Sequence, residues 1–188
     1  MAAQISQGLA PVWRPDAQVL ILGSLPGVAS LQAAQYYAHP RNQFWPLLQA
    51  LFGIDHRLAY PERLAALLQQ HVALWDLIAS AHRPGSLDSA IDPTTVQLNN
   101  LAALLAQLPQ LRAIWFNGAT AWQSWQRLAK RVDLSGHWRL CPLPSSSPAH
   151  ASLSFTDKLT CWQQALADSG WTAGGYVPAK SSLQRCDD

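Results

Sequence analysis

The sequence predicts an α/β fold, a three-layer α/β/α sandwich around a short four-stranded, mainly parallel sheet. Four short apolar runs have the length and composition of buried strands, and they are residues 18–23, 71–77, 111–117 and 137–142. Each run lies between segments of helical periodicity, and strands that alternate with helices form parallel sheets through βα units. The chain has 188 residues, of which 49% are hydrophobic, so it suits one domain with a sizeable core.

Capping residues and apolar spacing predict the helices. The predicted helices cover residues 43–52, 61–70, 94–108, 119–131 and 157–167. Asn42 is a favoured cap for the first of them, and Pro61 occupies a first-turn position that tolerates proline. Asp92 and Thr156 are the expected caps of the third and the last. Trp115, Trp122 and Trp125 fall on a strand and its following helix, so we expect them to pack in the core.

Composition argues against several classes of protein. No apolar run approaches the roughly 18 residues of a membrane span, and residues 1–16 lack the pattern of a signal peptide. Cys141, Cys161 and Cys186 are widely spaced, so we expect no zinc or iron–sulfur site and no cofactor. We therefore expect a cytoplasmic monomer with one domain, residues 1–171, and a loosely ordered polar tail, residues 172–188.

Polar loops follow the predicted strands at the edge where parallel sheets bind ligands. Gly23-Ser24-Leu25-Pro26-Gly27 follows the first strand, and residues 82–89 and 143–152 follow the second and fourth. The net charge of +2 is weak for a nucleic-acid binder, but backbone amides and hydroxyls can hold a few phosphates without it. The carboxyl edge of the sheet is therefore the predicted site.

The strand ends resemble the motifs of the uracil-DNA glycosylase superfamily. In order they read GSLPG, LWDLI, WFNG and CPLPSSSPAH, and residues 37–45, YAHPRNQFW, are similar to the A-H-P-x-N-x-F-W run of the mismatch-specific branch. The resemblance extends from Leu20 to Trp171. It implies a DNA partner, a three-layer fold and base excision without a metal.

One position departs from the superfamily pattern. Leu25 stands where members carry a water-activating Asp or Asn, and a leucine cannot orient water. The hypoxanthine-DNA glycosylase branch, family 6, also lacks that residue, and the Asn of its H-P-x-N element is held responsible instead. The resemblance therefore implies that Asn42 is catalytic, whereas a capping role for the helix 43–52 is the alternative.

The resemblance also implies which side chains bind the base. Tyr37 is the expected stacking partner and Tyr36 the expected packing residue, although Tyr37 could instead close the core. Asp76 matches a base-reading position: a carboxylate accepts from N1–H of hypoxanthine, and a protonated Asp donates to O6 or N7. Bonding of Asp76 to amides of the loop 82–89 is the alternative. The remaining predicted base-binding residues are Gly23, Ser24, Leu25 and Asn117, the last of which could also be a turn former.

The loop after the fourth strand is predicted to hold the DNA backbone. Its candidates are Pro144, Ser145, Ser146, Ser147, Pro148 and His150, with His150 or a neighbour as the wedge that fills the gap left by the base. Arg41, Arg83 and His82 are further candidate phosphate contacts, and Ser24 and Ser30 could contribute from the opposite side. Solvated surface is the alternative for each.

The predicted reaction is hydrolytic excision of a deaminated base, with hypoxanthine first and uracil second. Strand-cleaving lyase chemistry needs a nucleophilic lysine, and Lys130, Lys158 and Lys180 lie outside the motifs, so we expect a monofunctional enzyme. A non-catalytic nucleotide- or DNA-binding protein is the alternative of another class. The absence of G-x-G-x-x-G and G-x-S-x-G patterns argues against a dinucleotide cradle and a serine hydrolase.

Overall fold

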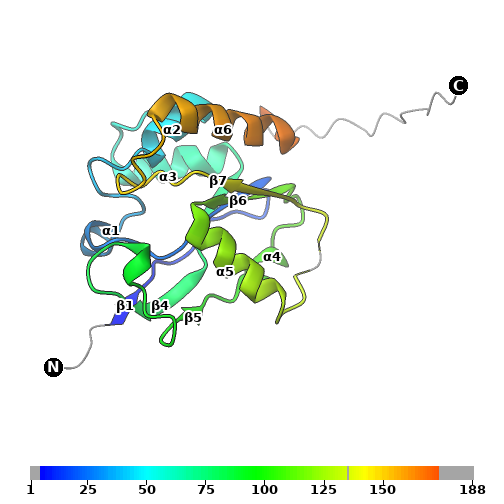
Figure 1. Ribbon diagram of the computed structural model, residues 1–188. Coiled ribbons are helices and arrows are strands. Elements are labelled where there is room, and N and C mark those ends of the chain that lie inside the picture. The colour runs from blue at the N-terminus through cyan, green and yellow to red at the C-terminus, as the bar shows by residue number, and fades with distance from the viewer. Residues whose placement is uncertain (1–4, 135, 174–188) are drawn as a thin grey trace, which may run out of the picture.

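The computed structural model describes residues 5–134 and 136–173, and a parallel sheet lies at its centre (Figure 1). Its strands are β2 (Val19–Gly23), β3 (Val72–Asp76), β6 (Ala113–Asn117) and β7 (Arg139–Leu143). They lie in the order β3-β2-β6-β7, and all three pairs are parallel. The predicted four-stranded parallel sheet is confirmed.

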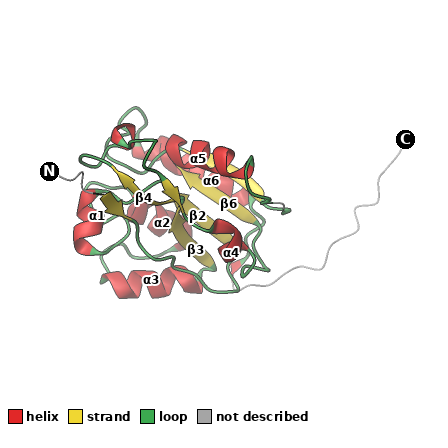
Figure 2. Cartoon of the chain, turned by 90° about the horizontal axis from the view of Figure 1, so that it is seen from below, coloured by secondary structure: helices red, strands yellow, loops and turns green. Residues whose placement is uncertain are grey.

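Helices cover both faces of this sheet (Figures 1 and 2). One face carries α2 (Phe44–Phe52), α3 (Tyr60–Gln69) and α6 (Phe155–Asp168), and the other carries α4 (Leu101–Leu105) and α5 (Ala119–Ala129). The short α1 (Val28–Ala33) follows the loop after β2. The predicted three-layer arrangement is therefore confirmed.

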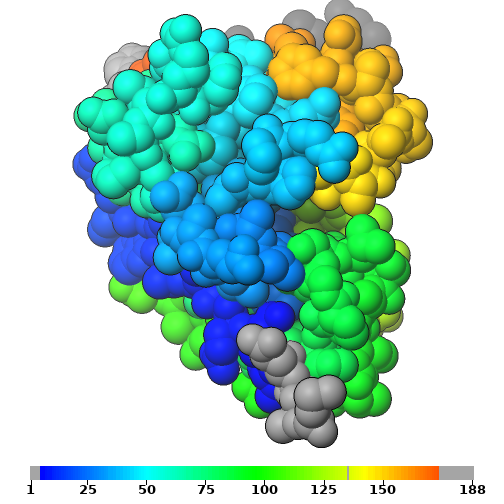
Figure 3. All heavy atoms as spheres, turned by 90° about the vertical axis from the view of Figure 1, so that its left-hand side faces the viewer, coloured from blue at the N-terminus to red at the C-terminus, as the bar shows by residue number. Residues whose placement is uncertain are grey.

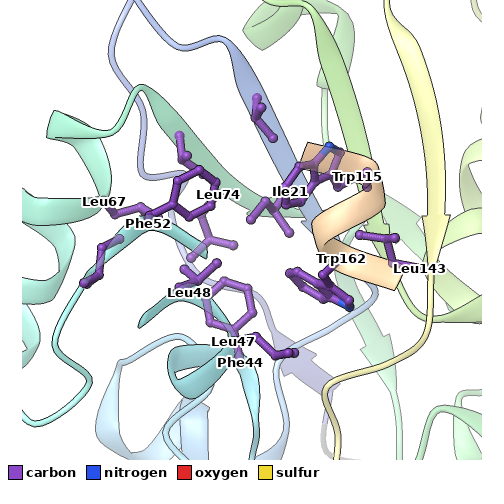
Figure 4. Close-up of a cluster of buried hydrophobic side chains, with 14 of the residues drawn as sticks. Ile21, Phe44, Leu47, Leu48, Phe52, Leu67, Leu74, Trp115, Leu143 and Trp162 are labelled. Carbon is purple, nitrogen blue, oxygen red and sulfur yellow. The ribbon is translucent and has the colours of Figure 1, made fainter. Parts of the chain in front are cut away.

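Successive residues of β2 and β6 point to opposite faces of the sheet and so build two cores. Ile21 and Trp115 pack under α2 and α6 in the cluster that Figure 4 shows, and both are fully buried. Leu20 and Phe116 pack against α4 and α5 on the other side. Trp115 and Trp125 are buried and Trp122 is partly buried against the second cluster, which confirms their packing role.

A second, antiparallel sheet was not expected. It consists of β1 (Ile5–Gln7), β4 (Ile78–His82) and β5 (Gln97–Leu98), in the order β1-β4-β5. A short 3₁₀ helix, η1 (Asp88–Ala90), lies in the loop between β4 and β5. This loop reaches the carboxyl edge of the central sheet and forms part of the cavity described below.

The prediction of a helix over 94–108 is wrong for its first half. Asp92 Oδ1 accepts hydrogen bonds from both the N–H and the hydroxyl of Thr94, and such side-chain bonds stabilise a turn in competition with a helix. The helix begins only at Leu101, and Asn100 is its cap, with Oδ1 accepting from the Ala103 N–H at 3.2 Å.

The last helix also has a different cap from the one predicted. Ser154 replaces Thr156, because Ser154 Oγ accepts from the Asp157 N–H while Asp157 Oδ2 accepts from the Ser154 N–H. This reciprocal capping box satisfies two helix-terminal donors at once.

Other expectations lie at the limits of what the structure describes. The predicted tail, residues 172–188, lies outside the described residues except for Thr172 and Ala173, and Thr172 exchanges two hydrogen bonds with the Gln18 side chain. No helix in the described ranges is long and apolar enough to cross a bilayer. Within these same ranges, no group of three His, Cys, Asp or Glu side chains is placed to hold a metal.

Candidate active site

A cavity of about 670 Å³ lies at the carboxyl edge of the central sheet. The segment after β2, the loop that contains η1 and the loop after β7 surround it, and they come together on the face that Figure 3 shows. Predicted residues that line it are Gly23, Ser24, Leu25, Ser30, Tyr37, Arg41, Asn42, Asp76, Asn117, Ser145, Ser146, Ser147, Pro148 and His150. The structure therefore brings together most of the residues that the motifs singled out.

Asp76, at the end of β3, is the buried carboxyl group of this cavity. Its residue is 3% exposed, and Oδ2 is buried with no hydrogen-bond partner. Burial raises the pKa of Asp76 to about 7, and the charge of Asp88 adds to this effect while Arg83 opposes it. The group therefore takes up or releases a proton near neutrality, unlike an ordinary aspartate.

Gly23, at the end of β2, leaves the room that this carboxyl group occupies. A Cβ atom at Gly23 would overlap Asp76 Oδ1 and would lie 3.0 Å from Tyr37 Oη. Gly23 pairs with Asp76 across the two parallel strands. The absence of a side chain at Gly23 thus lets Asp76 Oδ1 and Tyr37 Oη both approach the Gly23 backbone.

Tyr37 stacks on Phe44 and directs its hydroxyl toward the same spot. The ring centroids are 3.8 Å apart with an interplanar angle of 19°, and the Tyr37 backbone has a φ of 55°, which is rare for a residue with a side chain. Tyr37 Oη is buried without a hydrogen-bond partner, and burial, followed by the Asp76 charge, raises the pKa of Tyr37. The aromatic ring is therefore fixed in place before any ligand binds.

Tyr36 points into the core instead. It is 2% exposed, and its hydroxyl donates to the carbonyl of Ala10 at 3.0 Å. Its own carbonyl accepts from Trp45 Nε1. The prediction that Tyr36 is the packing member of the tyrosine pair is confirmed.

Asn42 lines the cavity and also supports the start of α2. Its Oδ1 accepts from the Phe44 N–H at 2.9 Å, and its own N–H donates to the His39 carbonyl at 2.8 Å. The helix cap itself is Gln43, one residue later than the capping alternative assumed. The amide oxygen has a second lone pair, so this bond leaves capacity for a further donor such as water.

Asn117, at the end of β6, is bonded to the loop after β7. Its Oδ1 accepts from the Ser146 N–H at 2.8 Å, and its Nδ2 donates to Ser146 Oγ at 2.9 Å. Ser146 is completely buried. The N–H of Ser146 donates to Asn117 and its Oγ accepts from Asn117, so this residue serves to hold the loop, and its contact with phosphate stays a prediction.

The other residues of this loop differ in position. Ser145, Ser147, Pro148 and His150 line the cavity, whereas Pro144 does not; its carbonyl accepts from Trp162 Nε1 at 3.2 Å. Pro144 therefore belongs to the support of the loop rather than to its cavity face.

Arg83 is not at the surface, so its predicted contact with phosphate is wrong. It is 4% exposed and donates to the carbonyls of Leu25 and Pro26, and its Nη1 lies 3.7 Å from Asp88 Oδ1. Burial lowers the pKa of Arg83. Arg83 thus stabilises the loop after β2 through these hydrogen bonds, whereas Arg41 is exposed at the rim of the cavity.

Ser24 and Leu25 line the cavity but are held by neighbouring groups. Ser24 Oγ donates to the Asp88 carboxylate at 2.8 and 2.9 Å, and Leu25 is buried in a small cluster with Ile78 and Ala81. Leu25 is 5% exposed, so the position where the superfamily pattern places a water-activating group is filled by an apolar contact.

Asp88 and His39 also line the cavity, and neither was predicted as a site residue. Asp88 is in the loop 82–89, which was identified, but its approach to Ser24 depends on how that loop folds back. His39 is part of the motif that contains Asn42, and its Nδ1 accepts from the Arg41 N–H at 3.1 Å. This bond places the proton of a neutral His39 on Nε2.

Comparisons with known proteins agree with this geometry. The family model of the uracil DNA glycosylase superfamily matches residues 10–168. A hypoxanthine DNA glycosylase from Methanosarcina barkeri is 39% identical over 113 residues, which are 60% of this chain and 70% of that protein. One from Methanosarcina acetivorans is 34% identical over 151 residues, 80% of this chain and 91% of that protein.

A solved structure has the same fold. The solution NMR structure of a candidate uracil DNA glycosylase from Methanosarcina acetivorans superposes with a TM-score of 0.73 at 31% identity, covering 88% of this chain and 99% of that one. The match over residues 10–168 includes every strand of the central sheet and all the strand-end motifs. The chain therefore belongs to the uracil DNA glycosylase superfamily and is a DNA glycosylase, with DNA as its substrate.

Proposed function

We propose that the protein excises hypoxanthine from DNA by hydrolysis of the N-glycosidic bond, and that it leaves an abasic site without cutting the strand. The observation that carries this proposal is the buried Asp76 carboxyl group, which faces the same spot as Tyr37 Oη in the cavity. Two relatives that are 34% and 39% identical are named hypoxanthine DNA glycosylases, which supports the same substrate.

The target nucleotide has to leave the base stack, because its anomeric carbon is inaccessible inside a duplex. The cavity of about 670 Å³ has ample room for an extruded base. Tyr37, held against Phe44, would stack on that base, an interaction worth about 1–3 kcal/mol. Extrusion costs least where the base is mispaired, so mispaired hypoxanthine is favoured over a normal base.

Asp76 would read the edge that deamination creates. Hypoxanthine presents an N1–H donor beside the C6=O acceptor, whereas adenine presents a bare N1. The ionised carboxylate accepts from N1–H, which adenine lacks, and the protonated carboxyl group pairs with the hypoxanthine edge through two hydrogen bonds, one donated to O6 and one accepted from N1–H. With a pKa of about 7, Asp76 has the proton for this pairing at and below neutral pH.

Asn42 would position the water that attacks the anomeric carbon. As the glycosidic bond stretches, the sugar takes on oxocarbenium character, and a correctly held water then completes hydrolysis. The Asn42 side chain lines the cavity, and its oxygen has a free lone pair beyond the bond from the Phe44 N–H. No step in this scheme needs a metal or a cofactor.

The loop after β7 and the cavity rim would hold the DNA backbone. Ser145, Ser147 and Pro148 line the cavity, and the hydroxyls of the two serines suit phosphate oxygens. Arg41 adds a positive charge at the rim, and His150 is our candidate for the wedge. Ser24, which donates to Asp88, belongs to the support of the site rather than to its phosphate contacts.

Uracil is the second candidate substrate. Its N3–H beside C4=O presents the same donor–acceptor edge as hypoxanthine, so the Asp76 pairing would accept it. A smaller pyrimidine ring would leave more of the cavity unfilled, and we therefore rank hypoxanthine first.

A panel of labelled oligonucleotides tests this proposal. Duplex and single-stranded DNA would carry hypoxanthine, uracil, xanthine or a thymine mismatch, and products would be separated with and without alkali. We expect excision of hypoxanthine first, strand breaks only after alkali, and a monomer by size-exclusion chromatography, as for a cytoplasmic monofunctional enzyme. DNA binding without any product would contradict the proposal and favour a binding protein.

A further inference from the structure

One lysine of the chain is buried beside the candidate active site. Lys158 lies in the first half of α6 and is 2% exposed, and its Nζ donates to Gln43 Oε1 at 3.0 Å. No ion pair joins it to a carboxylate within residues 5–134 and 136–173. A buried ammonium group without a carboxylate is costly, and this burial lowers the pKa of Lys158.

The partner of Lys158 lies between two segments of the site. Gln43 directly follows Asn42 and caps α2. Its backbone N–H donates to the carbonyl of Ser146 at 3.0 Å, so it also contacts the loop after β7. A single residue thus joins the turn of Asn42 to this loop, and Lys158 fixes its side chain.

Helix α6 holds the same loop at a second point. Trp162 lies one turn after Lys158, is fully buried, and donates from Nε1 to the Pro144 carbonyl at 3.2 Å. Asn117 holds Ser146 from the side of the sheet. Trp162 and Asn117 thus bond to the loop after β7, whereas Lys158 bonds to Gln43, the residue next to Asn42.

We propose that Lys158 is a positioning residue for base excision, acting through Gln43 to hold the Asn42 turn in register with residues 145–147. This inference rests on the proposed role of Asn42 in the reaction. Loss of the Lys158–Gln43 bond would let the two segments shift against each other, and a misplacement of about 1 Å at a reacting group costs up to roughly a hundredfold in rate.

A matched control separates positioning from general stability. Ser169, at the other end of α6, accepts from Trp115 Nε1 at 2.9 Å and donates to the Ala165 carbonyl, and it is 4% exposed. Ser169→Ala also removes a buried polar contact of α6. It leaves Lys158, Gln43 and the cavity untouched.

The test compares wild type, Lys158→Met, Gln43→Leu, the double variant and Ser169→Ala. Single-turnover excision should fall by about ten- to a hundredfold in Lys158→Met, with DNA affinity within about threefold. The double variant should be no slower than the slower single variant, because both changes break one contact. Ser169→Ala should lower Tm to a similar extent and keep the wild-type rate.

Amide hydrogen exchange gives a readout that needs no activity. The Gln43 N–H, which donates to Ser146, should exchange at least about tenfold faster in Lys158→Met and at the wild-type rate in Ser169→Ala. If wild type excises no base from the panel, the proposed function fails. The exchange rate still decides whether Lys158 holds Gln43 against the loop after β7.

Three results would overturn the inference. The first is a folded Lys158→Met protein in which the excision rate, or the exchange rate of the Gln43 N–H, equals that of wild type. The second is a loss of excision rate in Ser169→Ala in proportion to the fall in its Tm. The third is borohydride trapping of wild type on abasic DNA that Lys158→Met abolishes, since this would make Lys158 a nucleophile.

Discussion

Asn117 and Ser146 are joined by two hydrogen bonds that run in opposite directions. The Ser146 N–H donates to Asn117 Oδ1 at 2.8 Å, and Asn117 Nδ2 donates to Ser146 Oγ at 2.9 Å. Both residues are buried, and they connect the ends of the adjacent strands β6 and β7. The loop that is proposed to hold DNA is therefore fixed to the sheet from its inner side.

Asn117→Ala should loosen this loop and destabilise the protein. It leaves the buried N–H of Ser146 without an acceptor, which costs about 1–3 kcal/mol of unfolding free energy. Excision should fall as well, because residues 145–147 lose their anchor. Asn100→Ala is the matched control, since it removes the cap of α4 for about 1 kcal/mol and should leave excision unchanged. Urea denaturation and excision assays measure both; equal activity of the two variants would contradict the anchoring role.

Asp76 should make stability depend on pH. Burial raises the pKa of Asp76 from 3.8 to about 7, so the unfolded chain loses this proton near pH 4 and the folded protein only near pH 7. Between these values the folded state binds more protons, and the unfolding free energy therefore falls as pH rises, by about 4 kcal/mol in all.

The Asp76→Asn variant removes this titration. Its unfolding free energy, measured in urea from pH 4 to 8, should lack the fall that wild type shows. If the unfolding free energies of the two proteins changed with pH in the same way, Asp76 would not retain its proton in the folded state.

Gly23→Ala should disrupt the floor of the cavity. The added Cβ would overlap Asp76 Oδ1 and crowd Tyr37 Oη, so we expect a stability loss of about 1–3 kcal/mol and a large loss of excision. Gly27→Ala, in the same loop, brings its Cβ only to 3.4 Å from Ser86 Oγ and should keep most of the activity. Thermal unfolding and excision rates compare the two; equal effects would mean that the Gly23–Asp76 approach does not matter.

Tyr37→Leu should weaken binding of the extruded base. Loss of the aromatic surface removes about 1–3 kcal/mol of stacking, which corresponds to a rise in KM of roughly five- to 150-fold. Tyr37→Phe keeps the ring that stacks on Phe44 and should stay within about threefold of the wild-type KM. If Tyr37→Leu bound substrate as well as Tyr37→Phe does, stacking would be excluded as the role of this residue.

The sequence predicts much of the site because parallel strands end at one edge. Gly23, Asp76 and Asn117 each end a short apolar run, so their meeting in one cavity follows from the fold class. The second sheet was not predictable in this way, because Ile78 begins β4 only two residues after Asp76 and no turn signal separates the strands.

The roles of buried charged residues depend on contacts that local sequence does not contain. The Gly/Ser/Pro composition of its loop predicts that Arg83 lies at the surface. In the structure it donates to the carbonyls of Leu25 and Pro26, more than fifty residues earlier in the chain. Lys158 likewise bonds to Gln43, 115 residues away. Such partners emerge only when the segments are packed together.

In the proposed reaction Asn42 positions the attacking water, which Leu25 cannot do. Asn42→Ala also removes the bond to the Phe44 N–H, so its folded fraction has to be checked by urea denaturation, with Asn42→Asp as a control that keeps this acceptor. The most direct measurement is the single-turnover excision of hypoxanthine from a duplex by these proteins. We predict that folded Asn42→Ala binds DNA but excises no base, and that Asn42→Asp retains measurable activity. Excision at the wild-type rate by folded Asn42→Ala would contradict the catalytic role of Asn42.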